Sequence, residues 1–140
     1  MKIAIVNGPN LNLLGKREPE KYGSTTMEQI IRSLQQTYPQ VELTYFQSNS
    51  EGALIDHMQQ TGYDPEVTGI ILNAGAYTHT SLALADAIAA IPAPVVEVHL
   101  TNIHARETIR HTSLIAPVCR GSIAGFGADV YRLAMESFKK

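Results

Sequence analysis

The sequence predicts an α/β fold in which five parallel strands form a sheet between two layers of helices. Apolar segments of strand length alternate five times with segments of helical periodicity, a pattern typical of a parallel sheet covered on both faces. The chain has 140 residues, which fits a single domain, 1–140, with one core. Apolar residues make up 44% and charged residues 17% of it, as in ordinary globular proteins.

The N-terminal half is expected to contain two strands and two helices in alternation, at 2–6, 25–38, 41–46 and 51–61. The first strand is the short apolar run KIAIV. In the first helix Thr25 and Glu28 have the spacing of a capping box, and apolar residues recur on one face. The second strand alternates apolar and polar residues, and the second helix is closed by Gly62.

The C-terminal half is expected to contain three strands, at 67–73, 93–100 and 114–119, and three helices, at 81–91, 103–108 and 128–137. VTGIILN is a continuous apolar strand, and the helix after it is rich in alanine. A short helix is expected to start from Asn102. Cys119 is interpreted as a buried residue of the fifth strand.

At this length the alternation favours the flavodoxin-like doubly wound arrangement, a three-layer sandwich. Ligands of such folds bind outside the carboxyl ends of the strands. Functional residues are therefore expected just after Val6, Leu72, Val98 and Cys119.

Composition excludes several classes of partner. Lys and Arg number 11 and Asp and Glu 13, and no basic stripe indicates nucleic acid. No apolar run is long enough to span a membrane, and the N-terminal strand is too short for a signal peptide. Cys119 is the one cysteine, so no internal disulfide forms, which fits a reducing, cytoplasmic location. The histidines form no HxxxH or HExxH pair, and no metal site is expected.

Glu97 and His99 stand two residues apart at the end of the fourth expected strand, so both side chains point to one face. A carboxylate that holds one imidazole nitrogen leaves the other free to exchange a proton. The spacing fits an acid–base pair. A solvated strand end is the alternative, and spacing alone leaves both open.

The loop after the first strand is much longer than a plain strand-to-helix connection needs. It carries Arg17 and Tyr22 between Gly15 and Gly23, which could act as hinges. A guanidinium next to a phenol favours the charged phenolate. Two ordinary surface residues are the alternative reading of Arg17 and Tyr22.

Further polar residues stand near the expected strand ends. Asn73 ends the third strand, where its amide can bind a hydroxylated ligand. His79 precedes a helix, and the alternative is that its segment, YTHTS, only caps that helix. Arg106 and Arg110 are four residues apart and could share a helix face, and one of them could bind a substrate carboxylate or hydroxyl.

Taken together, these segments resemble one family, the type II 3-dehydroquinate dehydratases. The resemblance covers nearly the whole chain, in the family's order, and is carried by IAIVNGPNLNLLGKREPEKYG, ILNAGAYTHTSLALADAI, VVEVHLTNIHARETIRHTS and GSIAGFGADVYRLAM. It implies a flavodoxin-like fold and a cofactor-free trans dehydration of 3-dehydroquinate to 3-dehydroshikimate, in the shikimate or quinate pathway.

The resemblance also implies catalytic roles at matching positions. Tyr22 would be the base, as tyrosinate, and Arg17 would stabilise it. Asn10 would help to hold a water that donates to the enolate oxygen. His99, oriented by Glu97, would protonate the departing hydroxyl.

Binding roles follow in the same way. Asn73, His79 and Arg110 would bind substrate hydroxyls, and the backbone amides of Leu100 and Thr101 would take the substrate carboxylate. The family usually has Ser where this chain has Thr101, and we expect the extra methyl group to have a modest effect.

The family assembles as trimers packed into a dodecamer. Asp86, which from the sequence alone is a solvated helix carboxylate, would then reach the site of a neighbouring subunit.

Three other readings are disfavoured. A Schiff-base mechanism needs a lysine in the site, but the lysines lie in the first loop or near the termini. A flavodoxin-like receiver or flavin carrier would have acidic residues or a phosphate-binding loop after the first strand, and NGPNLNLLG is neither. A non-catalytic scaffold is disfavoured because every presumed catalytic residue is present.

Overall fold

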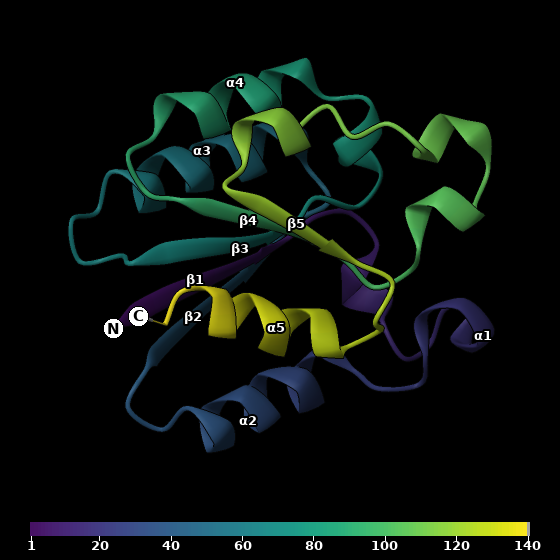
Figure 1. The fold of residues 1–140 in the computed structure, drawn as a ribbon, viewed down its shortest axis with the longest axis horizontal. Helices are drawn as coiled ribbons and strands as arrows, with labels where there is room; N and C mark the ends of the chain where they lie inside the picture. Colours follow the sequence, from purple (N-terminus) through teal and green to yellow (C-terminus); the bar gives the residue numbers. More distant parts are fainter. Residues whose placement is uncertain (140) are drawn as a thin grey trace.

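A parallel sheet of five strands forms the centre of the computed structural model, which describes residues 1–139 (Figure 1). The strands are β1 (Lys2–Asn7), β2 (Glu42–Gln47), β3 (Gly69–Asn73), β4 (Val95–His99) and β5 (Gly121–Ala124). Their order is β2-β1-β3-β4-β5, and all neighbouring pairs are parallel. This is the flavodoxin-like order, so the predicted fold class is confirmed.

Helices cover both faces of the sheet and complete three layers (Figure 1). The covering helices are α2 (Met27–Thr37), α3 (Glu51–Gly62), α4 (Leu82–Ala90) and α5 (Asp129–Ser137), whereas the short α1 (Pro19–Tyr22) lies to the side of the layers (Figure 1). α2 and α5 pack on one face and α3 and α4 on the other, each pair over its own buried apolar cluster. Among the described helices, none is long and apolar enough to cross a membrane.

The N-cap of helix α2 lies one residue further along the chain than predicted. Thr26, not Thr25, is the N-cap: its hydroxyl accepts from the Gln29 backbone N–H at 3.3 Å, and the Gln29 side chain accepts from the Thr26 N–H at 2.9 Å. The predicted pair was wrong because Thr25–Glu28 and Thr26–Gln29 have the same capping-box spacing, and only one pair can cap the start of the helix.

The fifth strand lies further along the chain than predicted. Residues 114–119 contain a 3-10 turn, Ala116–Val118, and the strand is Gly121–Ala124. Pro117 has no N–H to give to a sheet, and the Ser113 hydroxyl accepts from the Ala116 N–H at 3.0 Å, which fixes a turn instead. Cys119 is half-buried and lies outside the strand, so that interpretation was also wrong.

The segment after β4 is made of two short turns rather than the one helix expected over 103–108. They are Ile103–Ala105, which Asn102 caps by accepting from the His104 N–H at 3.0 Å, and Thr108–Arg110. Arg106 lies between the turns, so it shares no helix with Arg110.

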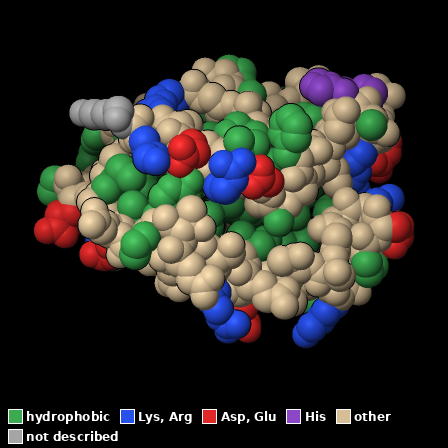
Figure 2. All heavy atoms as spheres, turned by 60° about the horizontal axis from the view of Figure 1, so that its bottom comes forward, with side chains coloured by type: hydrophobic (Ala, Val, Ile, Leu, Met, Phe, Trp, Pro, Cys, Tyr) green, Lys and Arg blue, Asp and Glu red, His purple; other side chains and the backbone are tan. Residues whose placement is uncertain are grey.

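Charged residues of both signs are mixed on the face formed by α2 and α5 (Figure 2). Figure 2 shows the face formed by α2 and α5, where Lys and Arg side chains lie among Asp and Glu and among apolar ones. That face carries no basic stripe, as the small net charge of -2 leads one to expect.

Candidate active site

A cleft opens at the carboxyl ends of the strands, where a doubly wound sheet places its ligands. Most of the candidate residues line it: Asn10, Arg17, Tyr22, Asn73, His79, His99, Leu100, Thr101 and Arg110. Pro9, Leu11, Gly75, Ala76, Ile103 and Arg106 complete the wall. The fold therefore brings together residues from four separate stretches of the chain.

Glu97 and His99 form a bonded pair on one face of β4. His99 Nε2 lies 2.8 Å from Glu97 Oε2, and both side chains are almost completely buried. The Ser113 hydroxyl donates to the same oxygen at 2.6 Å. Burial alone would raise the pKa of the Glu97 carboxyl, but the hydrogen bonds from His99 and Ser113 outweigh it and the pKa lies below its ordinary value. A charged Glu97 thus holds His99 by one nitrogen, with the imidazole at the cleft wall.

His79 stands beside this pair. Its ring lies 6.3 Å from the His99 ring, centroid to centroid, and the planes differ by 25°. The His79 Nδ1 is 2.8 Å from the Thr112 carbonyl oxygen. A carbonyl only accepts, so Nδ1–H is the donor and Nε2 is left for a ligand.

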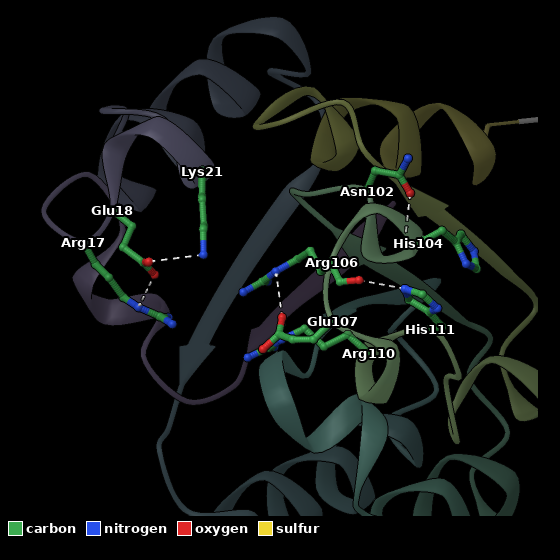
Figure 3. A network of polar contacts seen from close by, with 9 residues as sticks. All are labelled: Arg17, Glu18, Lys21, Asn102, His104, Arg106, Glu107, Arg110 and His111. Carbon is green, nitrogen blue, oxygen red and sulfur yellow. Dashed lines mark hydrogen bonds and ion pairs between the residues drawn. The ribbon is translucent and has the colours of Figure 1, made fainter.

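Two guanidinium groups lie close to the Tyr22 ring. Arg17 is 4.9 Å from the centre of its ring and Arg106 is 5.4 Å from it. The arginines come from different segments: Arg17 precedes α1, and Arg106 follows the first turn after β4 (Figure 3). Two guanidinium groups thus contact the ring of the candidate base.

The segments that carry these arginines are held by local contacts (Figure 3). Glu18 lies 3.6 Å from Arg17 and 3.4 Å from Lys21, so it ties the two ends of the turn into α1. On the other side His111 Nε2 donates to the Arg106 carbonyl at 2.7 Å. The Arg106 side chain is largely buried, and its Nε has no hydrogen-bond partner among the described residues.

Asn10 takes its place through an unusual backbone conformation. Its φ is 70°, in the left-handed region, and its N–H donates to Asn49 Oδ1 at 3.0 Å. Gln47 Nε2 donates to Asn49 Oδ1 and to the Gly8 carbonyl, both at 3.2 Å. The end of β2 thus anchors the start of the long loop.

Arginines supply the permanent charges of the cleft wall. Arg17, Arg106 and Arg110 line it and no carboxylate does so among the described residues, although Glu18 pairs with Arg17 and Glu107 pairs with both Arg106 and Arg110. Within residues 1–139 the N–H groups of Leu100 and Thr101 donate to no protein acceptor, so both are open to a ligand. An anionic substrate fits this environment.

Asp86, Cys119 and Asn7 do not line the cleft. Asp86 is exposed on α4 and does not line the cleft. Burial raises the pKa of the Cys119 thiol to about 12, which argues against a thiolate nucleophile there. Asn7 is fully buried behind the cleft. Within the described residues, no group of three or more His, Cys, Asp or Glu side chains could hold a metal ion.

Several residues that support the site carry no recognisable signal in the sequence. Ser113 and Asn49 have ordinary turn and capping patterns, and Tyr131 has the pattern of a helix core residue. Their contacts with Glu97, Asn10 and Asn73 arise only from the tertiary fold, so no spacing in the sequence points to them.

The fold and the cleft define the class of protein: a doubly wound α/β protein with a buried carboxylate–histidine pair and an arginine-flanked tyrosine at the ligand edge of its sheet. The chain belongs to the class II dehydroquinase family, whose model matches residues 1–139.

Individual relatives agree with this assignment. The 3-dehydroquinate dehydratase of Exiguobacterium sp. is 56% identical over 138 residues, which cover 98% of this chain and 93% of the relative. That of Roseiflexus castenholzii is 54% identical and covers 97% of this chain and 87% of its own. The crystal structure of type II dehydroquinase from Butyrivibrio crossotus superposes with a TM-score of 0.95 at 40% identity, over 100% of this chain and 98% of that one.

Proposed function

We propose that this chain removes water from 3-dehydroquinate to give 3-dehydroshikimate, by trans elimination through an enolate. The activity follows from the family: the chain is a type II 3-dehydroquinate dehydratase, a lyase of the shikimate pathway. The observation that carries the mechanism is that one cleft holds a tyrosine close to two guanidinium groups and a histidine bonded to a buried carboxylate.

The first step is proton removal from the carbon beside the ring ketone. Tyr22, as tyrosinate, takes the proton, and the electron pair of the broken C–H bond moves to the ketone oxygen to form an enolate. Arg17 and Arg106 stabilise the negative charge before it moves to the substrate. Asn10, at the cleft wall, helps to hold a water that donates to the enolate oxygen.

The second step is loss of the hydroxyl group. The enolate re-forms the ketone, the new carbon–carbon double bond forms, and the C–O bond breaks as His99 gives a proton to the oxygen that leaves as water. Glu97 holds the other ring nitrogen and stabilises the imidazolium before transfer. Proton transfer from Tyr22 back to His99 restores the enzyme, so the sum of the steps is loss of one water.

Substrate binding is assigned to the remaining cleft residues. The Asn73 amide, His79 Nε2 and the Arg110 guanidinium bind ring hydroxyls. The unpaired N–H groups of Leu100 and Thr101 bind the carboxylate. Because this contact is to the backbone, we expect Thr101 to serve in place of the family's usual Ser.

The assembly is part of the same proposal. We expect trimers packed into a dodecamer, with Asp86 completing the site of a neighbouring subunit. Its exposed position on α4, outside its own cleft, is compatible with that role. The cytoplasmic location and the single-domain organisation stay predictions.

The assignment is tested by following the ultraviolet absorbance of the conjugated enone product with 3-dehydroquinate as substrate. We expect turnover by the wild type and near-total loss in Tyr22→Phe, since phenylalanine has no group that accepts a proton. Tyr38→Phe, which removes a hydroxyl bonded to Glu136 far from the cleft, is the matched control and should retain full activity. No product from folded wild type would refute the function, and an active Tyr22→Phe would refute the base.

A further inference from the structure

We propose that Tyr131 is a positioning residue for the active site: its buried hydroxyl fixes the orientation of the Asn73 amide. The proposal rests on the substrate-binding role of Asn73 given above. Tyr131 belongs to α5 and lies in the apolar cluster under the sheet, and it does not line the cleft. It acts on the substrate only through Asn73.

The hydroxyl stands in a line of hydrogen bonds that crosses the sheet behind the cleft. Asn73 Nδ2 lies 3.3 Å from Tyr131 Oη, and Tyr131 Oη lies 2.8 Å from Asn7 Oδ1. Asn7 Nδ2 is 3.4 Å from Tyr45 Oη, and at the other end the Gly75 N–H donates to Asn73 Oδ1 at 3.2 Å. The line thus joins β3, α5, β1 and β2.

One group in this line can only donate, and it sets the direction of the other hydrogen bonds. The Gly75 backbone N–H only donates, so the Asn73 oxygen must face it and the Asn73 amino group must face Tyr131. Tyr131 then accepts from Asn73 and gives its single proton to Asn7. If the Asn73 amide were flipped, its amino group would face the Gly75 N–H, and two donors would meet without an acceptor.

Burial makes this direction costly to break. Asn7 and Tyr131 are completely buried, and Asn73 is 3% exposed. Burial raises the pKa of the Tyr131 phenol far above its ordinary value, so the group stays a neutral donor. Because a buried polar group without a partner is strongly disfavoured, each side chain holds its neighbour in place.

The consequence lies in the cleft. One Asn73 N–H is used by Tyr131, and the second hydrogen of the same planar amide is held in a fixed direction for a ligand hydroxyl. Without the Tyr131 hydroxyl the amide keeps only its bond from Gly75, and its amino group loses its buried acceptor. We expect weaker substrate binding with the chemistry itself intact.

Tyr131→Phe tests this, because it keeps the ring and removes only the hydroxyl. We expect KM for 3-dehydroquinate to rise about fivefold, the usual scale of one hydrogen bond, with kcat changed less than about twofold. Tyr38→Phe is the matched control: it also removes a tyrosine hydroxyl that contacts α5, through Glu136, and should leave KM unchanged.

A double-mutant cycle separates positioning from a general loss of structure. Once Asn73→Ala has removed the amide, adding Tyr131→Phe should leave KM unchanged. The proposal is overturned by an unchanged KM in Tyr131→Phe, by an equal rise in both backgrounds, or by a Tyr131→Phe chain that does not fold.

A measurement that does not depend on catalysis distinguishes failure of this proposal from failure of the proposed function. The side-chain amide resonances of Asn73 should shift in Tyr131→Phe and stay in place in Tyr38→Phe. If the wild type formed no product, the proposed function would fail, and these resonances would still decide whether Tyr131 orients Asn73. Unmoved resonances would contradict the positioning role.

Discussion

The Glu97 carboxylate accepts a hydrogen bond of 2.8 Å from His99 on the same face of β4, inside the protein and one side chain behind the cleft. Ser113 bonds to the same oxygen, and the second Glu97 oxygen has no partner among residues 1–139. The orientation of His99 therefore depends on one carboxylate oxygen.

Glu97→Gln should lower kcat by about tenfold to a hundredfold while KM changes little, because the amide keeps the shape but loses the charge that stabilises the imidazolium. The measurement is steady-state kinetics at neutral pH. Asp129→Asn, which removes an exposed carboxylate paired with Arg132 on α5 and outside the cleft, is a comparison for general charge effects. An unchanged kcat in Glu97→Gln would show that the Glu97–His99 pair does not act in catalysis.

The same pair makes stability depend on pH. The pKa of Glu97 is lower in the folded protein than its ordinary value of 4.5, so the folded state favours the charged form. This stabilisation is fully present above the unfolded pKa and is lost as the pH falls through the folded pKa. We expect the melting temperature of Glu97→Gln to be lower than that of the wild type at pH 7. The difference between the two melting temperatures should become smaller as the pH falls below about 4.5. A gap that stays constant down to acid pH would contradict the shift.

Arg106→Ala should reduce kcat by about a hundredfold, since one of the two charges beside Tyr22 is lost where negative charge develops. Arg120→Ala is the matched control: Arg120 lies 4.8 Å from the Phe138 ring, a similar contact away from the cleft. We expect it to keep wild-type kinetics. Equal losses in both variants would show that the effect comes from structure and not from the charge beside Tyr22.

Much of the fold follows from local pattern. The alternation of apolar and helical segments indicates a parallel sheet, and the two-residue spacing of Glu97 and His99 places them on one face. The strand-end rule then locates the cleft, which Asn73 and Tyr22 indeed line.

The errors and omissions have physical causes. The apolar run at 114–119 reads as a strand, yet Ile115 is buried as part of a turn that Pro117 and Ser113 favour. Arg106 contacts Tyr22 and Tyr131 contacts Asn73, although the residues of each pair lie far apart in the sequence. Such pairs depend on topology, which residue spacing does not encode.

If Asp86 completes the site of a neighbouring subunit, as proposed, inactive chains should complement one another. Tyr22→Phe and Asp86→Ala are each expected to be nearly inactive alone. If the two residues of a site come from different subunits, hybrids refolded from an equal mixture should regain about a quarter of wild-type activity, because that share of sites has both native residues. No recovery in verified mixed oligomers would place both residues in the same subunit or remove Asp86 from the site.

In the proposed mechanism Tyr22 and His99 act on opposite sides of the substrate ring. The most direct test uses 3-dehydroquinate with deuterium at one or the other hydrogen of the carbon beside the ketone, and mass spectrometry of the product. The mechanism predicts loss of the hydrogen trans to the departing hydroxyl, so deuterium at that position disappears and deuterium at the cis position stays. Loss of the cis hydrogen would contradict the account.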